Sequence, residues 1–310
     1  MLRCSANVKE RLIISEVTIF SFFESPSIWG IGLAIIFGAF WLLLLTPLGW
    51  KRPARWFVFL SGAFIFVPSI ALVQLPLQRA LSLFLAAQLG IATYERDIIY
   101  LSIPAVLISG IVQEAAKLIP IAIYWLIRKR DLMPRFGLAI GALVGAGYGV
   151  FEAQWLLSEI FAAGFDFSWL SAFGLIALGG FWERFFTVAF HTASGAVMGW
   201  GLAKGKWWLF YLFTTFWHFA LNYTVVLYRT NNLSNLQVEL LIAIMADIIF
   251  VFAFLLRWRT VKLPELEKAV LTAEPLPTAE TTLPASDNTA PSEVTKQSET
   301  KADEPPQPRT

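Results

Sequence analysis

Residues 28–50 read IWGIGLAIIFGAFWLLLLTPLGW and contain no ionisable side chain. As an α-helix this segment is long enough to cross the hydrocarbon core of a bilayer, which is about 30 Å thick and takes about 20 residues. Only 15% of the 310 residues are charged, and the mean hydropathy is +0.63, whereas soluble domains average about 25% charged residues. These properties exclude a soluble globular protein and predict an all-α polytopic membrane protein.

Apolar runs of comparable length recur along the chain and predict about seven transmembrane helices in all. Besides residues 28–50, these runs cover residues 56–78, 98–127, 136–158, 184–203, 207–228 and 238–256. Two shorter apolar stretches, residues 80–94 and 165–182, are flanked by charged residues and predict interfacial or re-entrant segments.

The predicted organisation is an N-terminal segment (1–27), a seven-helix transmembrane domain (28–262) and a C-terminal tail (263–310). The tail is rich in Pro and Thr and carries nine acidic residues against four basic ones, which predicts disorder because it has too few apolar residues to offset the entropy of ordering. Clusters of Lys and Arg fall in alternate loops, so the N-terminus is expected outside and the C-terminus in the cytoplasm. We expect an integral protein of a prokaryotic cytoplasmic membrane, in contact with the lipid bilayer.

The composition also limits the chemistry that the chain can perform. Its single cysteine, Cys4, allows neither an internal disulfide nor a dithiol redox centre. The basic residues lie in short clusters between apolar runs and form no extended basic surface, so no nucleic-acid partner is expected.

Ionisable residues inside the expected spans are the candidate functional residues, because an unpaired charge near the centre of a bilayer costs several kcal/mol. A rise of about 1.5 Å per residue places the polar groups of four helices at a similar depth, which predicts one shared site within residues 98–228. The candidate catalytic residues are Glu114, Glu152, His191, His218 and Asn222, and the candidate supporting residues are Gln113, Lys117 and Arg184.

Two mechanisms are compatible with these side chains. Two imidazoles and a carboxylate with an open coordination position are typical of a hydrolytic Zn²⁺ site, and His191, His218 and Glu152 are the candidate ligands. Without a metal, a desolvated glutamate acts as general base on water while His and Asn donate to the developing oxyanion. The His-Glu-x-x-His spacing is absent, so the sequence leaves open whether the cofactor is zinc or none.

Four short motifs follow one another in successive expected helices: Gln113 to Lys117 (QEAAK), Gly145 to Glu152, Arg184 to His191, and His218 to Asn222. In these motifs, which span residues 110–222, the chain resembles the PrsW-type intramembrane proteases, which belong with the CAAX-protease-like membrane peptidases. Residues 183–194 are also similar to the YhfC group of membrane peptidases. The resemblance implies an intramembrane protease that cleaves membrane or membrane-tethered proteins, with the glutamates of the first motif activating water.

The first motif departs from the family pattern, which usually has two adjacent glutamates where this chain has Gln113 and Glu114. If the first carboxylate is the required base, activity is lost or moves to Glu114 or Glu152. A non-catalytic relative that binds membrane partners therefore stays open as an alternative. A proton-coupled transporter is a third possibility, since ionisable groups inside membranes also build proton relays, although no inverted repeat is visible in the sequence.

Overall fold

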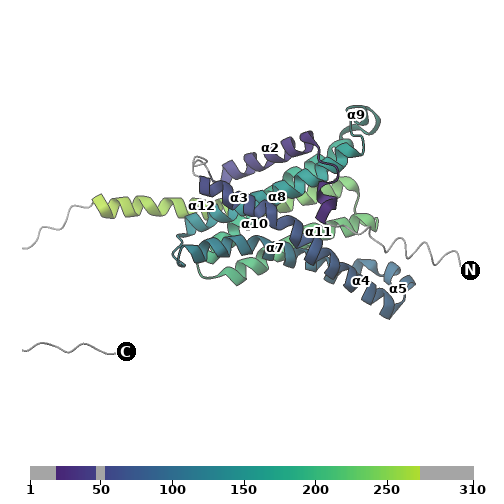
Figure 1. The fold of residues 1–310 in the computed structure, drawn as a ribbon, viewed down its shortest axis with the longest axis horizontal. Helices are drawn as coiled ribbons and strands as arrows, with labels where there is room; N and C mark the ends of the chain where they lie inside the picture. The colour runs from purple at the N-terminus through teal and green to yellow at the C-terminus, as the bar shows by residue number, and fades with distance from the viewer. Residues whose placement is uncertain (1–18, 47–52, 273–310) are drawn as a thin grey trace, which may run out of the picture. The chain divides into compact units, whose positions relative to one another are not determined.

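The structure, a computed structural model, describes residues 19–46 and 53–272, with side chains described as far as residue 259. Every regular element in these ranges is a helix (Figure 1), in agreement with the predicted all-α class. Residues Met1–Glu267 form one compact unit and Lys268–Thr310 a second. The fold that matters for function lies in the first unit.

The chain order of the elements is η1 (Ile19–Phe23), α2 (Ile28–Leu45), α3 (Pro53–Pro68), η2 (Ser69–Gln74), α4 (Leu75–Leu89), α5 (Ile91–Arg96), α6 (Ile98–Leu101), α7 (Ile103–Ile127), α8 (Pro134–Ala162), α9 (Ser168–Phe173), η3 (Gly174–Leu178), α10 (Gly179–Ala203), α11 (Trp207–Arg229) and α12 (Asn235–Thr272).

Six helical runs are long and apolar enough to cross a membrane, which indicates an integral membrane protein. They are Ile28–Leu45, Pro53–Leu89, Ile98–Ile127, Pro134–Ala162, Ser168–Ala203 and Asn235–Arg259. The remaining expected span, residues 207–228, forms α11, a helix of 23 residues. It is not among the six, because its many Trp, Tyr and Thr side chains are less hydropathic than aliphatic ones.

The two segments expected at the interface join longer helical runs instead. Residues 80–89 continue α4, which follows α3 and η2 within the 37-residue run Pro53–Leu89. Pro68 ends α3, and a π-helical turn at Ser69–Gln74 follows it within the predicted span 56–78, so the helical run continues past the predicted end of that span to Leu89. Residues 179–182 likewise form the first turn of α10.

Both predicted terminal segments lie largely outside the described ranges. Of the N-terminal segment, only residues 19–27 are described, and of the predicted disordered tail only residues 263–272. Those tail residues are helical, because α12 continues to Thr272. The rest of the predicted tail lies outside the described residues.

Helix α8 is the most enclosed of the six candidate spans, with 78% of its window buried against 22–39% for the others. It packs against α10, α2 and α3, and α8 and α10 lie side by side in Figure 1. A Cβ atom on Gly141 would collide with the backbone of Gly195, and one on Gly145 with the backbone carbonyl of His191. The glycines of α8 therefore allow α10 to approach closely, as small residues do in membrane helices, and they bring His191 against α8.

A second helix pair consists of α7 and α11. A Cβ atom on Gly110 would lie 2.7 Å from the backbone oxygen of Thr215, so this glycine permits a close approach between the two helices. The phenol of Tyr211 donates a hydrogen bond to the backbone oxygen of Ile111 at 2.9 Å. The candidate site lies where this pair meets the α8–α10 pair.

Candidate functional site

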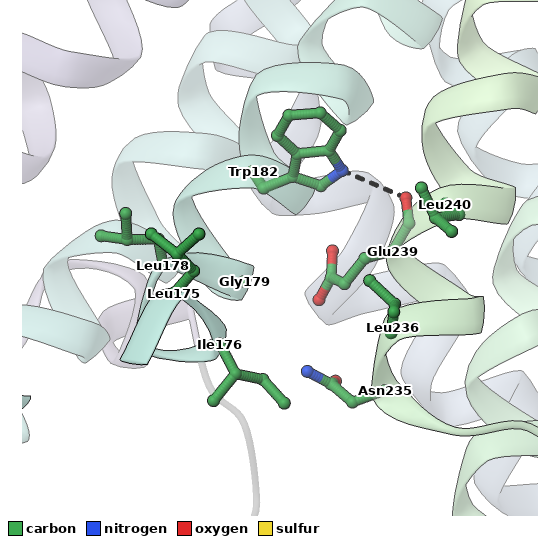
Figure 2. Close-up of a pocket in the computed structure, with 9 residues that line it drawn as sticks. All are labelled: Leu175, Ile176, Leu178, Gly179, Trp182, Asn235, Leu236, Glu239 and Leu240. Carbon is green, nitrogen blue, oxygen red and sulfur yellow. Dashed lines mark hydrogen bonds between the residues drawn. The ribbon is translucent and has the colours of Figure 1, made fainter. Parts of the chain in front are cut away.

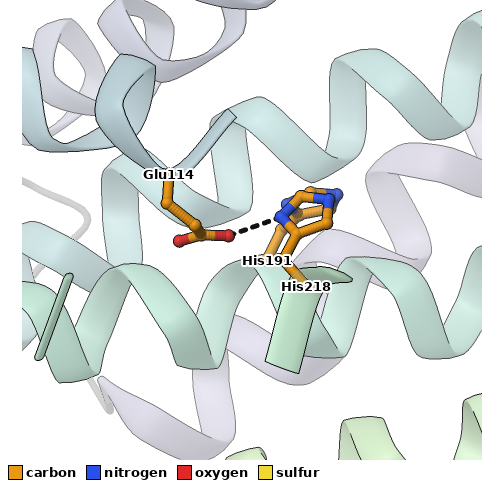
Figure 3. Close-up of side chains that lie close together, drawn as sticks. All are labelled: Glu114, His191 and His218. Atoms are coloured by element: carbon orange, nitrogen blue, oxygen red, sulfur yellow. Dashed lines mark hydrogen bonds and ion pairs between the residues drawn. The ribbon is translucent and has the colours of Figure 1, made fainter. Parts of the chain in front are cut away.

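Five of the residues predicted from the sequence meet in one buried network, formed by α7, α8, α10 and α11. Glu114 and Lys117 are fully buried, and His191 and His218 are 3% and 2% exposed. Figure 3 shows Glu114 facing the two imidazoles, which come from different helices. The side chain of Glu152 is 18% exposed and lies at the edge of the network.

Lys117 lies at the centre of the network and uses all three of its N–H donors. Its Nζ is 2.6 Å from Oε1 of Glu114, 3.1 Å from Nδ1 of His191 and 2.7 Å from Oγ of Ser194. The ammonium also lies 5.6 Å from the ring centroids of Tyr148 and Phe190, a distance at which aromatic faces attract a cation. The charge is thus compensated without water.

The contacts of His191 define which of its nitrogens carries the proton. Since Nδ1 faces the ammonium of Lys117, Nδ1 accepts and the proton belongs on Nε2. Nε2 lies 2.7 Å from Oε2 of Glu152, the acceptor that this tautomer requires. Glu152 therefore fixes the orientation and the tautomer of His191, in the way that outer carboxylates fix functional imidazoles.

The two carboxylate oxygens of Glu114 differ in their hydrogen-bond partners. Oε1 lies 2.6 Å from Nδ1 of His218 as well as 2.6 Å from Nζ of Lys117. Oε2 is buried and has no hydrogen-bond partner within the part of the chain that the structure describes. A buried acceptor without a partner is costly and uncommon, so Oε2 of Glu114 is a position in the network that is suited to bind a further donor.

Arg184 extends the network from Glu152 to the protein surface. Its Nη1 is 3.1 Å from Oε1 of Glu152, and its Nη2 pairs with Glu183. Arg184 and Glu183 both line a cavity of about 390 Å³ between α8 and α10. The sequence left open whether Arg184 anchors the interface or serves the site, and its contacts connect the two.

Gln113 and Asn222 make their hydrogen bonds outside this network. Gln113 donates to the side-chain oxygen of Gln74 at 3.0 Å, and Asn222 donates to Oγ of Ser109 at 2.8 Å. Asn222 therefore does not lie beside the same partners as His218, although the two residues are one helical turn apart. Each amide instead ties α7 to a neighbouring helix.

The candidate metal ligands differ from the predicted set. The group whose ligand atoms lie within 4.8 Å of one another consists of Glu114, His191 and His218, whereas the sequence suggested Glu152 in place of Glu114. Glu152 contacts the outer nitrogen of His191, which in a zinc site is the place of a supporting carboxylate.

These three side chains could hold a metal ion, but Lys117 already contacts two of them. Its Nζ binds Oε1 of Glu114 and Nδ1 of His191, so the ammonium lies between two of the residues that would coordinate the ion. A divalent cation at this place requires the ammonium to move away or to lose its proton, because two like charges within a few Å repel strongly in a dry interior. In this arrangement the donor set fits a metal only after Lys117 is displaced.

Three members of the surrounding shell, namely Ser194, Ser69 and Gln74, were not recognised from the sequence. Ser194 accepts from Lys117, Tyr148 shares a hydrogen bond of 3.0 Å with Ser69, and Gln74 binds Gln113. Ser194 carried a signal, since it lies three residues after His191 on the same helix face. Ser69 and Gln74 carried none, because their placement depends on the π-helical turn at Ser69–Gln74.

Comparisons with protein-family models, with curated proteins and with solved structures found no match for this chain.

Proposed function

We propose that this chain is an intramembrane endopeptidase that hydrolyses peptide bonds of membrane or membrane-tethered proteins, with water activated by Glu114. The observation that supports this most directly is the unequal use of the Glu114 carboxylate. Lys117 and His218 hold Oε1, while the buried Oε2 has no hydrogen-bond partner in the described part of the chain. A carboxylate oxygen held in this way is available to accept a proton from a water molecule.

The remaining residues supply the other parts of a metal-free hydrolysis. Glu114 takes a proton from water, and the hydroxide attacks the scissile carbonyl carbon. The positive charge of Lys117, whose three N–H donors are all paired inside the network, stabilises the developing oxyanion by its charge alone. The proton then passes to the leaving amine nitrogen, which restores the Glu114 carboxylate. Glu152 acts through His191, whose tautomer it holds, and is a positioning residue.

Relationship to the PrsW-type proteases is part of the same proposal. The motif residues Glu114, Lys117, Glu152, His191 and His218 belong to one network, which the resemblance by itself did not require. Gln113, at the position of the usual first glutamate, binds Gln74 instead. We therefore assign the role of base to Glu114.

A metal-dependent form of the same hydrolysis is the second candidate, favoured by the closeness of the ligand atoms of Glu114, His191 and His218. These three residues would hold the ion, which would supply Lewis-acid activation of water. The position of Lys117 makes this the less favoured form.

The membrane arrangement that goes with this function has seven spans, α11 being the seventh beside the six apolar runs. Helix α11 carries His218 into a network that the other helices bury, and a span is the placement that keeps this imidazole at the depth of its partners. Seven spans give an external N-terminus and a cytoplasmic C-terminus under the positive-inside rule. We assign the protein to a prokaryotic cytoplasmic membrane.

The proposal is tested with the purified full chain in liposomes that contain a library of quenched fluorescent transmembrane peptides. Glu114→Gln keeps the shape of the side chain and removes the base, so kcat is expected to fall by about 10²–10⁴. Asp247→Asn is the matched control, because Asp247 is an exposed acid on α12 outside the network. Unchanged cleavage by Glu114→Gln would contradict the proposal.

The same experiment also distinguishes the proposed protease from a non-catalytic relative that binds membrane partners. The complete internal pairing of Lys117 also suits a network that only joins helices. If the unaltered protein cleaves no peptide of the library, while Glu114→Gln lowers its thermal stability, the network is structural and the protease assignment is wrong.

A further inference from the structure

A second cavity lies away from the buried network, between η3 with the start of α10 on one side and the first turns of α12 on the other. Its volume is about 480 Å³, and Figure 2 shows apolar side chains on both of its walls. Leu175 and Leu236, one on each wall, are 83% and 65% exposed. These walls are therefore open to the surroundings rather than closed by protein.

One acidic side chain interrupts the apolar lining. The carboxylate of Glu239 points between the two walls in Figure 2, and its Oε2 is buried without a hydrogen-bond partner among the described residues. The nearby indole of Trp182 donates to the backbone oxygen of Glu239 at 3.1 Å, so it leaves the carboxylate unsatisfied. A buried acceptor of this kind favours a ligand that brings both donors and positive charge.

Residue 179, which lines the cavity beside the carboxylate, is a glycine. A Cβ atom on Gly179 would lie 3.0 Å from Oε1 of Glu239. The missing side chain therefore lets the carboxylate of Glu239 lie close to the backbone of α10 at the edge of the cavity.

The depth of the cavity indicates what kind of molecule reaches it. The candidate span Asn235–Arg259 begins four residues before Glu239, which is about 6 Å along the helix axis. Glu239 thus lies near one end of the candidate span, and the ends of a span lie near the boundary between lipid headgroups and acyl chains. Exposed leucines at this level face lipid.

We propose that this cavity binds a phospholipid with a primary ammonium headgroup, of the phosphatidylethanolamine type. The ammonium donates to Glu239, and an acyl chain lies along the leucines of η3 and α12. A headgroup that carries only negative charge is repelled by the carboxylate, and a quaternary ammonium brings charge but no N–H donor. The assignment is independent of the proposed protease activity, because it concerns binding at a different place.

Native mass spectrometry of the detergent-purified full chain tests the assignment. The protein is titrated with phosphatidylethanolamine, phosphatidylcholine and phosphatidylglycerol that carry identical acyl chains. The unaltered protein is expected to retain phosphatidylethanolamine at least fivefold more strongly than the other two. Glu239→Gln is expected to remove this preference, and Asp247→Asn, a matched change further along α12, is expected to keep it.

A second variant covers the case in which Glu239→Gln does not fold. Gly179→Ala retains the carboxylate and places a Cβ atom against its Oε1, so it is expected to weaken phosphatidylethanolamine binding while the binding of phosphatidylglycerol stays unchanged. Equal retention of all three lipids by the unaltered protein would overturn the proposal. So would an unchanged preference in folded Glu239→Gln, or retention of a Lys-flanked apolar peptide in place of phosphatidylethanolamine, which would identify a peptide-docking site.

Discussion

Lys117 and Glu114 form an ion pair of 2.6 Å one helical turn apart on α7, and both side chains are completely buried. The pair is bound on both sides, because Glu114 also contacts His218 and Lys117 also contacts His191. A charge pair in this position links three helices, so its two members cannot be changed independently.

The first prediction concerns this coupling. Lys117→Met leaves Glu114 as an uncompensated buried carboxylate, and removal of one partner of a buried pair costs about 3–5 kcal/mol. The double variant Glu114→Gln with Lys117→Met removes both charges and is expected to be more stable than Lys117→Met alone. Chemical unfolding in detergent of the unaltered protein, the two single variants and the double variant measures the coupling free energy between the two side chains. Strictly additive losses would show that the two charges act independently.

The second prediction concerns metal binding. Lys117→Ala removes the ammonium from the place between Glu114 and His191, and Glu114, His191 and His218 keep ligand atoms within 4.8 Å of one another. The variant is expected to bind one Co²⁺ or Zn²⁺ that the unaltered protein does not bind, measured by visible absorption of the cobalt form and by metal analysis. Metal at one equivalent in the unaltered protein, with activity lost on chelation, would instead favour the metal-dependent mechanism.

The third prediction concerns the tautomer of His191. Glu152→Leu removes the acceptor beside Nε2 of His191, so the fraction of the Nε2–H form is expected to decrease. A loss of about 10–100-fold in kcat is expected, as for outer carboxylates that orient functional histidines. Nitrogen NMR of labelled histidine reports the tautomer directly. A lowered kcat with an unchanged histidine spectrum would mean that Glu152 acts in another way.

The fourth prediction concerns the contact between α8 and α10. In Gly145→Ala the added methyl group collides with the backbone of His191, and overpacking of this kind costs about 1–3 kcal/mol. Gly32→Ala on α2 is the matched control, because a Cβ atom there meets nothing within 4 Å, and alanine favours a helix over glycine by about 1 kcal/mol. The melting temperature should therefore fall in Gly145→Ala and rise in Gly32→Ala. Equal shifts would contradict the close contact.

The fifth prediction concerns pH and a residue outside the candidate spans. The hydroxyl and the backbone N–H of Ser168 donate to Asp166 and hold the pKa of its carboxyl below the ordinary value. A lowered pKa in the folded state stabilises the fold above the ordinary pKa of about 4, and this stabilisation is lost as the pH falls. The difference in melting temperature between the unaltered protein and Asp166→Ala is expected to be present at pH 6 and to shrink towards pH 3. A difference in melting temperature that grows as the pH falls would contradict the lowered pKa of Asp166.

Much of the fold was predictable because membrane spans leave a strong signal. The expected runs 136–158, 184–203, 207–228 and 238–256 each lie within one helix, runs 56–78 and 98–127 each lie within a continuous helical run, and residues 28–45 of the first run form α2. The span predicted for residues 56–78 already crossed Pro68 and Pro76, but the continuation of the helical run to Leu89 was not predicted, because the charged Arg79 indicated an end. Here a π-helical turn accommodates the first proline, and the second lies in the first turn of α4.

The sequence predicted most of the residues of the buried network, but not which side chains of the network contact one another. Depth along each helix indicated that Glu114, Glu152, His191 and His218 share a level, but depth does not specify the direction in which a side chain points. Rotation about the helix axis decides that Glu152 contacts the outer nitrogen of His191 and that Asn222 faces Ser109. These rotations follow from packing between helices, which a single sequence does not reveal.

The network is divided between two helix pairs, and along the chain the α8–α10 pair lies between the two members of the α7–α11 pair. Glu114, Lys117 and His218 come from α7 and α11, whereas Glu152 and His191 come from α8 and α10. No continuous fragment that ends before α11 can therefore contain the complete set. During synthesis, the network therefore stays incomplete until α11, the penultimate long helix, has been inserted, and the pair of Lys117 and Glu114 is without one of its two imidazole partners up to that point.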